Sequence, residues 1–216
     1  MLKNKYDLVL LDLDGTTADT DEVIVQSLYA LYDLYRDGKR SPREKIVYFS
    51  GPPIRGSLMG EFPDMDPDFM VEEFKRVSWD MYDKYAKAFP HVLETLSLLR
   101  DRDIHLGVVT SKLHKQTEHC MSVIKMLDIV PYFIAGDDVT NLKPNPEGIY
   151  KAMKDFGIKD KSRVLYVGDN YSDYMTSVNA GVDCAMVKWG PRVIKEEIHP
   201  KYYLNDFKDL EDIIYG

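Results

Sequence analysis

Five short, mostly apolar runs recur along the chain, at residues 8–11, 104–109, 132–135, 164–167 and 184–187. They are rich in β-branched or aromatic residues, and helix-length segments separate the last four of them. A run that is apolar at successive positions is typical of a strand covered on both faces of a parallel sheet. The pattern therefore predicts five buried strands in a β-α-β rhythm.

The segments between these runs carry apolar residues at three- and four-residue spacing, which predicts amphipathic helices over residues 91–102, 113–127, 146–156 and 172–180. Gly157 and Gly181 stand where two of these helices should end. Strands alternating with helices favour an α/β fold. We expect a doubly wound, open, mostly parallel sheet with helices on both sides.

Residues from about 20 to 86 break this rhythm, because no strand run occurs there. Helical spacing predicts two long helices at 21–36 and 68–87 and a shorter one at 42–48. A helical insertion after the first strand explains why 216 residues exceed a minimal domain of this kind. We predict a core formed by residues 1–17 and 88–216 and an inserted helical domain at 18–87.

Composition narrows the class of protein. The chain has 36 acidic and 28 basic residues, a net charge of −8, and the charges are interspersed. This balance disfavours binding to nucleic acid or to an anionic membrane, and no apolar run approaches the length of a membrane span. The N-terminus lacks a signal-peptide pattern. We expect a cytoplasmic protein, a monomer or weak homodimer, with Cys120 and Cys184 reduced.

Polar motifs follow the predicted strands. In an open α/β sheet, ligands bind beyond the carboxyl ends of the strands, so these positions should meet in space. The motifs are Asp12-Leu13-Asp14-Gly15-Thr16 after the first run, Thr110-Ser111-Lys112 after the second, Lys143-Pro144 eight residues past the third, and Gly168-Asp169-Asn170-Tyr171-Ser172-Asp173 at the end of the fourth.

Four of these residues, Asp12, Asp14, Asp169 and Asp173, are carboxylates. Like charges side by side are costly unless a cation neutralises them or one of them holds a proton. The cluster suggests a hard divalent ion with oxygen ligands, most simply Mg²⁺. The alternative is that each aspartate caps the following helix, which for Asp169 alone would be the preferred interpretation but not for the set.

Thr110 and Ser111 offer hydroxyl and backbone N–H donors at a predicted helix start, and Lys143 offers a positive charge. Together they could hold a phosphoryl group against the metal. Lys112 and Lys188 are also within conceivable reach of a substrate. Exposed lysines are usually solvated, however, and we expect these two to belong to the surface.

The order of these motifs resembles that of the haloacid dehalogenase-like hydrolase superfamily: Asp-x-Asp-Gly-Thr after a strand, then Thr-Ser, then Lys-Pro-x-Pro, then Gly-Asp-x-x-x-Asp. The stretches that look most like its phosphoglycolate phosphatase and bacterial pyrophosphatase branch are Val167-Gly168-Asp169-Asn170, Asn179-Ala180-Gly181 and Val187-Lys188-Trp189-Gly190. Thr17 stands where the common pattern has Leu, and should tune packing under the site.

The resemblance implies that Asp12 attacks phosphorus to form an aspartyl-phosphate, while Asp14 protonates the leaving oxygen and later deprotonates water. It implies that Asp12, the backbone carbonyl of Asp14 and Asp169 hold Mg²⁺, with Asp173 orienting this shell. Thr110, Ser111 and Lys143 would then stabilise the phosphoryl oxygens.

The inserted helices look like the mobile cap of this superfamily, and Gly51-Pro52-Pro53-Ile54-Arg55 is similar to its substrate-specificity loop. A stiff Gly-Pro-Pro turn would carry Arg55 towards the sheet, where a guanidinium could pair with a second anionic group of the substrate. An equally plausible interpretation is a surface arginine beside a stiffened loop. If Arg55 reaches the substrate, small dianions such as phosphoglycolate or pyrophosphate should be preferred to bulky nucleotides.

The function expected from these residues is Mg²⁺-dependent hydrolysis of a small phosphomonoester or of pyrophosphate. A sugar phosphomutase of the same superfamily would keep every motif and is the nearest alternative. A phospho-accepting signalling domain also combines clustered carboxylates with a lysine, but it carries its acceptor at the third strand and has no room for a 70-residue insertion. A binding module without activity is disfavoured because every chemical position is filled.

Overall fold

The computed structural model describes residues 4–50, 53–190 and 197–216. Its main sheet has six strands in the order β5-β4-β1-β6-β7-β8, and every neighbouring pair is parallel. The strands are β1 (Leu8–Leu11), β4 (His105–Val109), β5 (Phe133–Ile134), β6 (Val164–Gly168), β7 (Asp183–Val187) and β8 (Tyr202–Leu204). The five predicted strands are confirmed, and β8 is an additional edge strand.

Helices cover both faces of this sheet, as the helical spacing predicts. Val9 and Leu11 of β1 pack against α5, α6 and α9, whereas Leu8 and Leu10 pack against α7 and α8. Alternate residues of one strand thus enter two different cores, which is why the run is apolar throughout. The helices are α5 (Val92–Asp101), α6 (His114–Val123), α7 (Glu147–Asp155), α8 (Tyr171–Ala180) and α9 (Asp209–Tyr215).

The two glycines predicted to end helices have left-handed backbones. Gly181 follows α8 with φ 73°, and its N–H bonds to the carbonyl oxygen of Ser177, while Gly157 lies two residues beyond α7 with φ 71°. A residue with a Cβ is strained in this conformation, so glycine at these positions stops each helix and returns the chain towards the sheet.

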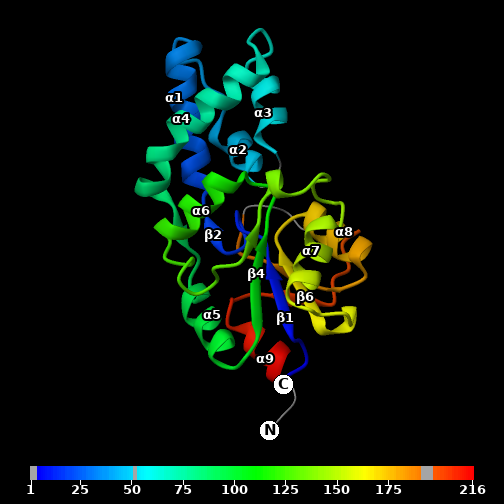
Figure 1. Ribbon diagram of the computed structural model, residues 1–216. Coiled ribbons are helices and arrows are strands. Elements are labelled where there is room, and N and C mark those ends of the chain that lie inside the picture. Colours follow the sequence, from blue (N-terminus) through cyan, green and yellow to red (C-terminus); the bar gives the residue numbers. More distant parts are fainter. Residues whose placement is uncertain (1–3, 51–52, 191–196) are drawn as a thin grey trace.

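Residues 20–86 form a second group of helices with its own apolar cluster, built mainly from α1 and α4. Figure 1 shows these helices gathered at one end of the molecule, beyond the carboxyl ends of β1 and β4. They are α1 (Asp21–Tyr35), α2 (Arg43–Ile46), the short 3-10 helix η1 (Val47–Phe49), α3 (Ile54–Glu61) and α4 (Pro67–Tyr85). The helix α3 is absent from the sequence prediction.

The chain enters and leaves this group of helices through a small antiparallel pair, β2 (Ala18–Asp19) with β3 (Lys87–Ala88). A second connection is the contact of α4 with α6. There the ring of Trp79 stacks on that of His119 at 4.1 Å between centroids, and His119 lies 3.2 Å from Asp83. This strand pair and the contact of α4 with α6 both hold the helices against the core. None of the described helices combines the length and apolar character needed to span a bilayer.

Candidate active site

The carboxyl ends of β1, β4 and β6 bring the predicted site residues to one edge of the sheet. Asp12 follows β1 directly, and its N–H continues the ladder by donating to the carbonyl oxygen of Val167 at 2.9 Å. Thr110 and Asp169 follow β4 and β6 in the same way. Since neighbouring parallel strands end side by side, residues more than 150 positions apart in sequence become neighbours.

Three of the four aspartates form a buried cluster. Asp12, Asp169 and Asp173 each offer a carboxylate oxygen, and these three oxygens lie within 4.8 Å of one another. Only Lys143 of the described residues places an ammonium group here, with its Nζ 2.8 Å from Asp12 and 2.6 Å from Asp173. Three carboxylates and one cation leave a negative surplus, and this oxygen-only donor set fits a hard divalent ion such as Mg²⁺.

Burial alters the titration of this cluster. Loss of solvent raises the pKa of Asp12 to about 6, with Asp173 and Asp14 adding to the rise and Lys143 opposing it. Burial would lower the pKa of Lys143, but Asp12 and Asp173 keep it well above its ordinary value. Lys143 therefore remains a cation, while Asp12 holds its proton up to a higher pH than an ordinary carboxyl group does.

Asp173 is fixed by the start of α8 and by the end of β6. Its Oδ2 accepts from the backbone N–H groups of Asp169 and Asn170, each at 3.2 Å, and its Oδ1 accepts from the Tyr166 hydroxyl at 3.2 Å. A Cβ on Gly168 would lie only 2.3 Å from the Cβ of Asp173. Glycine is required at this position because α8 approaches the strand so closely.

Asp14 lies outside the three-carboxylate cluster, in a pair of its own. Both of its oxygens are 2.8 Å from the Nζ of Lys112, and one accepts from the Thr20 hydroxyl at 2.6 Å. The expectation that Lys112 is a solvated surface residue is wrong, since its side chain is only 9% exposed. Burial would lower the pKa of Lys112, but the adjacent Asp14 carboxylate keeps it above its ordinary value.

The loop between β4 and α6 holds Thr110 and Ser111. The helix begins only at His114, so the two residues precede it and do not lie at its start as predicted. Thr110 is buried, and its hydroxyl accepts from the N–H of Lys112 at 3.2 Å. At the carboxyl end of β1, the Thr17 hydroxyl donates to the carbonyl oxygen of Asp12 at 3.0 Å. Thr17 thus holds the loop that follows β1 by a hydrogen bond.

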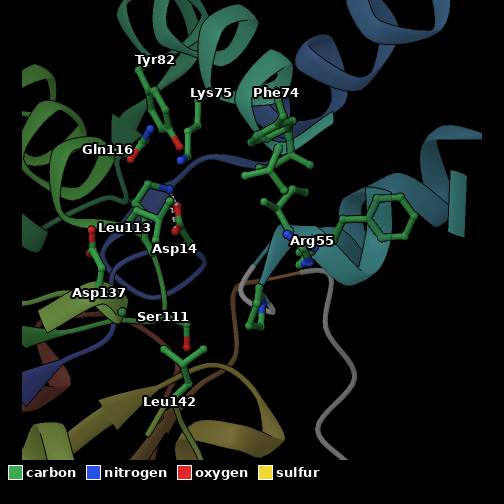
Figure 2. A pocket seen from close by; sticks show the side chains of 17 residues that line it. Asp14, Arg55, Phe74, Lys75, Tyr82, Ser111, Leu113, Gln116, Asp137 and Leu142 are labelled. Atoms are coloured by element: carbon green, nitrogen blue, oxygen red, sulfur yellow. Dashed lines mark hydrogen bonds and ion pairs between the residues drawn. The ribbon is translucent and has the colours of Figure 1, made fainter. Parts of the chain in front are cut away.

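A cavity of about 340 Å³ opens between the inserted helices and the core, next to Asp14. Figure 2 shows Phe74, Lys75 and Tyr82 of α4 on one side of it, with Ser111, Asp137 and Leu142 of the core on the other. Arg55 also lines this cavity. It lies in the first turn of α3, about half exposed, and its guanidinium is paired with Asp68. Gly51 and Pro52 of the predicted specificity loop lie outside the described residues.

Two contacts of the site could not be anticipated from motifs. Tyr166 lies within β6, and its hydroxyl bonds to Asp173 and to Lys143, the latter at 3.3 Å. Thr20 lies just before α1 and bonds to Asp14. A buried tyrosine in an apolar strand signals a partner for its hydroxyl, although it does not say which one.

The family model described as haloacid dehalogenase-like hydrolase matches residues 9–187. A curated relative, pyrophosphatase PpaX of Bacillus pumilus, is 33% identical over 223 aligned residues, which cover 99% of this chain and 99% of the relative. The family expected from the motifs is thereby confirmed.

Solved structures of similar fold cover almost the whole chain. One from Clostridium difficile, described as a "Putative Phosphatase", has a TM-score of 0.81 at 27% identity and covers 98% of this chain and 99% of its own. Another from Thermotoga maritima, described as a "putative beta-phosphoglucomutase", has a TM-score of 0.78 at 18% identity and covers 96% of this chain and 98% of its own. The second likeness shows a shared fold only.

Proposed function

Because this chain belongs to the haloacid dehalogenase-like hydrolases and is a phosphatase, we propose that it hydrolyses small phosphorylated compounds in a Mg²⁺-dependent reaction, with Asp12 as the nucleophile. The observation that carries the proposal is the meeting of Asp12, Asp169 and Asp173 within 4.8 Å, with Lys143 bonded to two of them. A nucleophilic carboxylate, metal ligands and a fixed cation at one strand edge are what phosphoryl transfer requires.

In this proposal Asp12, Asp169 and the backbone carbonyl of Asp14 hold Mg²⁺, and Asp173 orients them. The ion supplies positive charge that offsets the carboxylates and the oxygens of the phosphoryl group. Lys143 cannot do this alone, because its ammonium group is already shared between Asp12 and Asp173. A phosphate dianion would otherwise meet the surplus negative charge of the cluster.

In the first step a carboxylate oxygen of Asp12 forms a bond to phosphorus while the bond from phosphorus to the leaving oxygen breaks. Asp14 gives its proton to that leaving oxygen, so the product departs as an alcohol or as a protonated phosphate. Asp12 is then an aspartyl-phosphate. Thr110, the Ser111 amide and Lys143 stabilise the phosphoryl oxygens through hydrogen bonds and charge.

In the second step Asp14 accepts a proton from water, the water oxygen bonds to phosphorus, and the bond from phosphorus to Asp12 breaks. Phosphate leaves, Asp12 is restored and Asp14 is again protonated. The Nζ of Lys112 lies 2.8 Å from both oxygens of Asp14 and holds this side chain in place for the proton transfers. We assign Lys112 a positioning role on Asp14, an assignment that motif order alone does not suggest.

We also propose that residues 18–87 act as a cap over a core formed by residues 1–17 and 88–216. The separate apolar cluster of the helices supports this division. Arg55, at the rim of the cavity, remains a candidate for contact with the substrate. Both a phosphomonoester and pyrophosphate fit the mechanism, the latter being what the Bacillus pumilus relative is named for.

A sugar phosphomutase would use the same residues and is the alternative. Hydrolysis is favoured because the curated relative that covers the whole chain is a hydrolase, whereas the mutase likeness extends to the fold alone. Release of phosphate in the absence of any bisphosphate activator distinguishes the two reactions.

The experiment is phosphate release from an aryl phosphate by the full chain with Mg²⁺, with EDTA, and for the Asp12→Asn variant. We expect EDTA and Asp12→Asn each to abolish turnover. Asp128→Asn changes the same side chain at an exposed position and serves as the control that keeps full activity. Full activity of Asp12→Asn would overturn the proposal.

A further inference from the structure

The cavity beside Asp14 has a wall that is mostly apolar. Phe49, Ile54, Val71 and Phe74 line it from the inserted helices, and Leu113 and Leu142 line it from the core. These six side chains come from three helical elements and two loops, so apolar surface faces the space from both the inserted helices and the core. In the proposed reaction Asp14 protonates the leaving oxygen, and the leaving group must therefore lie in this cavity.

The cations of the cavity are already neutralised. Among the described residues that line it, Arg55 pairs with Asp68, Lys75 lies 2.7 Å from Glu72, and Lys112 lies 2.8 Å from Asp14. A further carboxylate, Asp137, also lines the space. A second anionic group on the substrate would compete with Asp68 for Arg55 and with Glu72 for Lys75, and because both pairs are solvent-exposed this competition costs little.

We propose that the preferred substrate is a phosphomonoester whose leaving group is an uncharged apolar body, alkyl or aromatic, that fills this cavity. The inference rests on the proposed function, and it narrows the choice that the catalytic residues leave open. A phosphate or carboxylate in the same place would exchange its water for a wall that is mostly apolar. An apolar group displaces water from the wall at no such cost. Pyrophosphate and phosphoglycolate are accordingly poorer substrates.

The test is the specificity constant kcat/KM for a series of n-alkyl phosphates from methyl to octyl, with Mg²⁺. These esters differ little in intrinsic reactivity, so chain length reports burial of the leaving group. We expect kcat/KM to rise about fourfold per methylene until the cavity is full and then to level off. The values of kcat/KM for pyrophosphate and phosphoglycolate, measured under the same conditions, should be lower than the value for butyl phosphate.

Two changes at one wall position sharpen the test. Val71→Asn makes the wall polar and should flatten the dependence on chain length. Val71→Phe fills part of the space and should move the plateau to shorter chains. Val178→Asn is the control, because it makes the same change from valine to asparagine at an exposed position of α8, away from the cavity. Its dependence of kcat/KM on chain length should be that of the natural chain.

The outcomes separate this inference from the proposed function. If neither the esters nor pyrophosphate is hydrolysed, the proposed function itself fails. If phosphate is released but kcat/KM is independent of chain length, or pyrophosphate exceeds every alkyl phosphate, the hydrolase stands and the apolar leaving group is refuted. A rise with chain length that Val71→Asn does not alter would refute the assignment to this cavity.

Discussion

Two lysines lie buried at the carboxyl edge of the sheet, and their surroundings differ. Lys143, with a side chain 5% exposed, bonds to Asp12 and Asp173 and lies among three carboxylates. Lys112 bonds to the single carboxylate of Asp14, and its Nζ lies 4.8 Å from the centre of the Tyr82 ring of α4. The first lysine is enclosed by the core, and the second lies where the core meets the inserted helices.

The two surroundings differ in whether they can accept a metal ion. One cation against three carboxylates leaves negative charge for Mg²⁺ to neutralise, whereas the pair of Lys112 and Asp14 leaves none. The two lysines also have different tasks. Lys143 holds charge at a fixed place, while the setting of Lys112 depends on the position of α4. The different surroundings of the two lysines lead to three expected results.

The largest effect should come from Lys143→Met. It leaves Asp12 and Asp173 buried without their cation, which should destabilise the metal-free protein by about 3–5 kcal/mol. Loss of a donor to the phosphoryl oxygens should lower kcat by about 10²–10³-fold. Urea unfolding in EDTA measures the loss of stability, and steady-state kinetics measure the loss of kcat. Lys115→Met, at an exposed position of α6, is the control; an equal loss in that variant would contradict the assignment.

A smaller effect is expected from pH. The folded pKa of Asp12, about 6, lies above the value of 3.8 for an unperturbed carboxyl. Between these two values the folded metal-free protein binds more protons than the unfolded chain, so its stability should fall as pH rises through this window. The contribution is at most about 3 kcal/mol.

Urea unfolding in EDTA at pH 4.5 and pH 7 measures this contribution. Other groups titrate in the same range, so the quantity of interest is the difference between the natural chain and Asp12→Asn, which has no proton to lose. If both lose the same stability between the two pH values, the buried carboxyl is not the cause.

The smallest effect on stability should follow Lys112→Met. Asp14 keeps the Thr20 hydroxyl as a partner, so we expect a loss of about 1–3 kcal/mol. A misplaced Asp14 should lower kcat by about 10–10²-fold. The rise in melting temperature on adding Mg²⁺ should stay as in the natural chain and be altered in Lys143→Met. An equal change in both variants would mean that the two lysines serve one centre.

Much of the sheet could be predicted because its strands carry a simple signal. Residues 8–11 and 164–167 are apolar at successive positions, and both prove to be strands buried on two faces. The edge strand β8 has three residues, of which only Leu204 is buried, and so presents no such run. In α3, likewise, Leu58 alone is buried, and Gly56 and Gly60 weaken the helical pattern.

In the site, the motifs at the strand ends predicted which residues lie close together. Pairs of residues far apart in sequence and outside these motifs could not be predicted. Asp12 and Asp169 follow strand ends and Asp173 lies in the first turn of α8 just beyond β6, so the direction of the sheet brings them together. Lys112 is separated from Asp14 by 98 positions, and nothing in its neighbourhood distinguishes it from a surface lysine. Its burial follows from packing beneath Tyr82, which becomes visible only once α4 is placed over the core.

The stack of Trp79 on His119 gives the molecule a natural optical reporter. Only two tryptophans occur in the chain, and the ring of Trp189 packs with the rings of Phe89 and Phe207. An imidazole in face contact with an indole alters its emission, so the fluorescence of Trp79 records whether α4 still rests on α6. In a Trp189→Phe background this one signal follows the helices during turnover, without any attached dye.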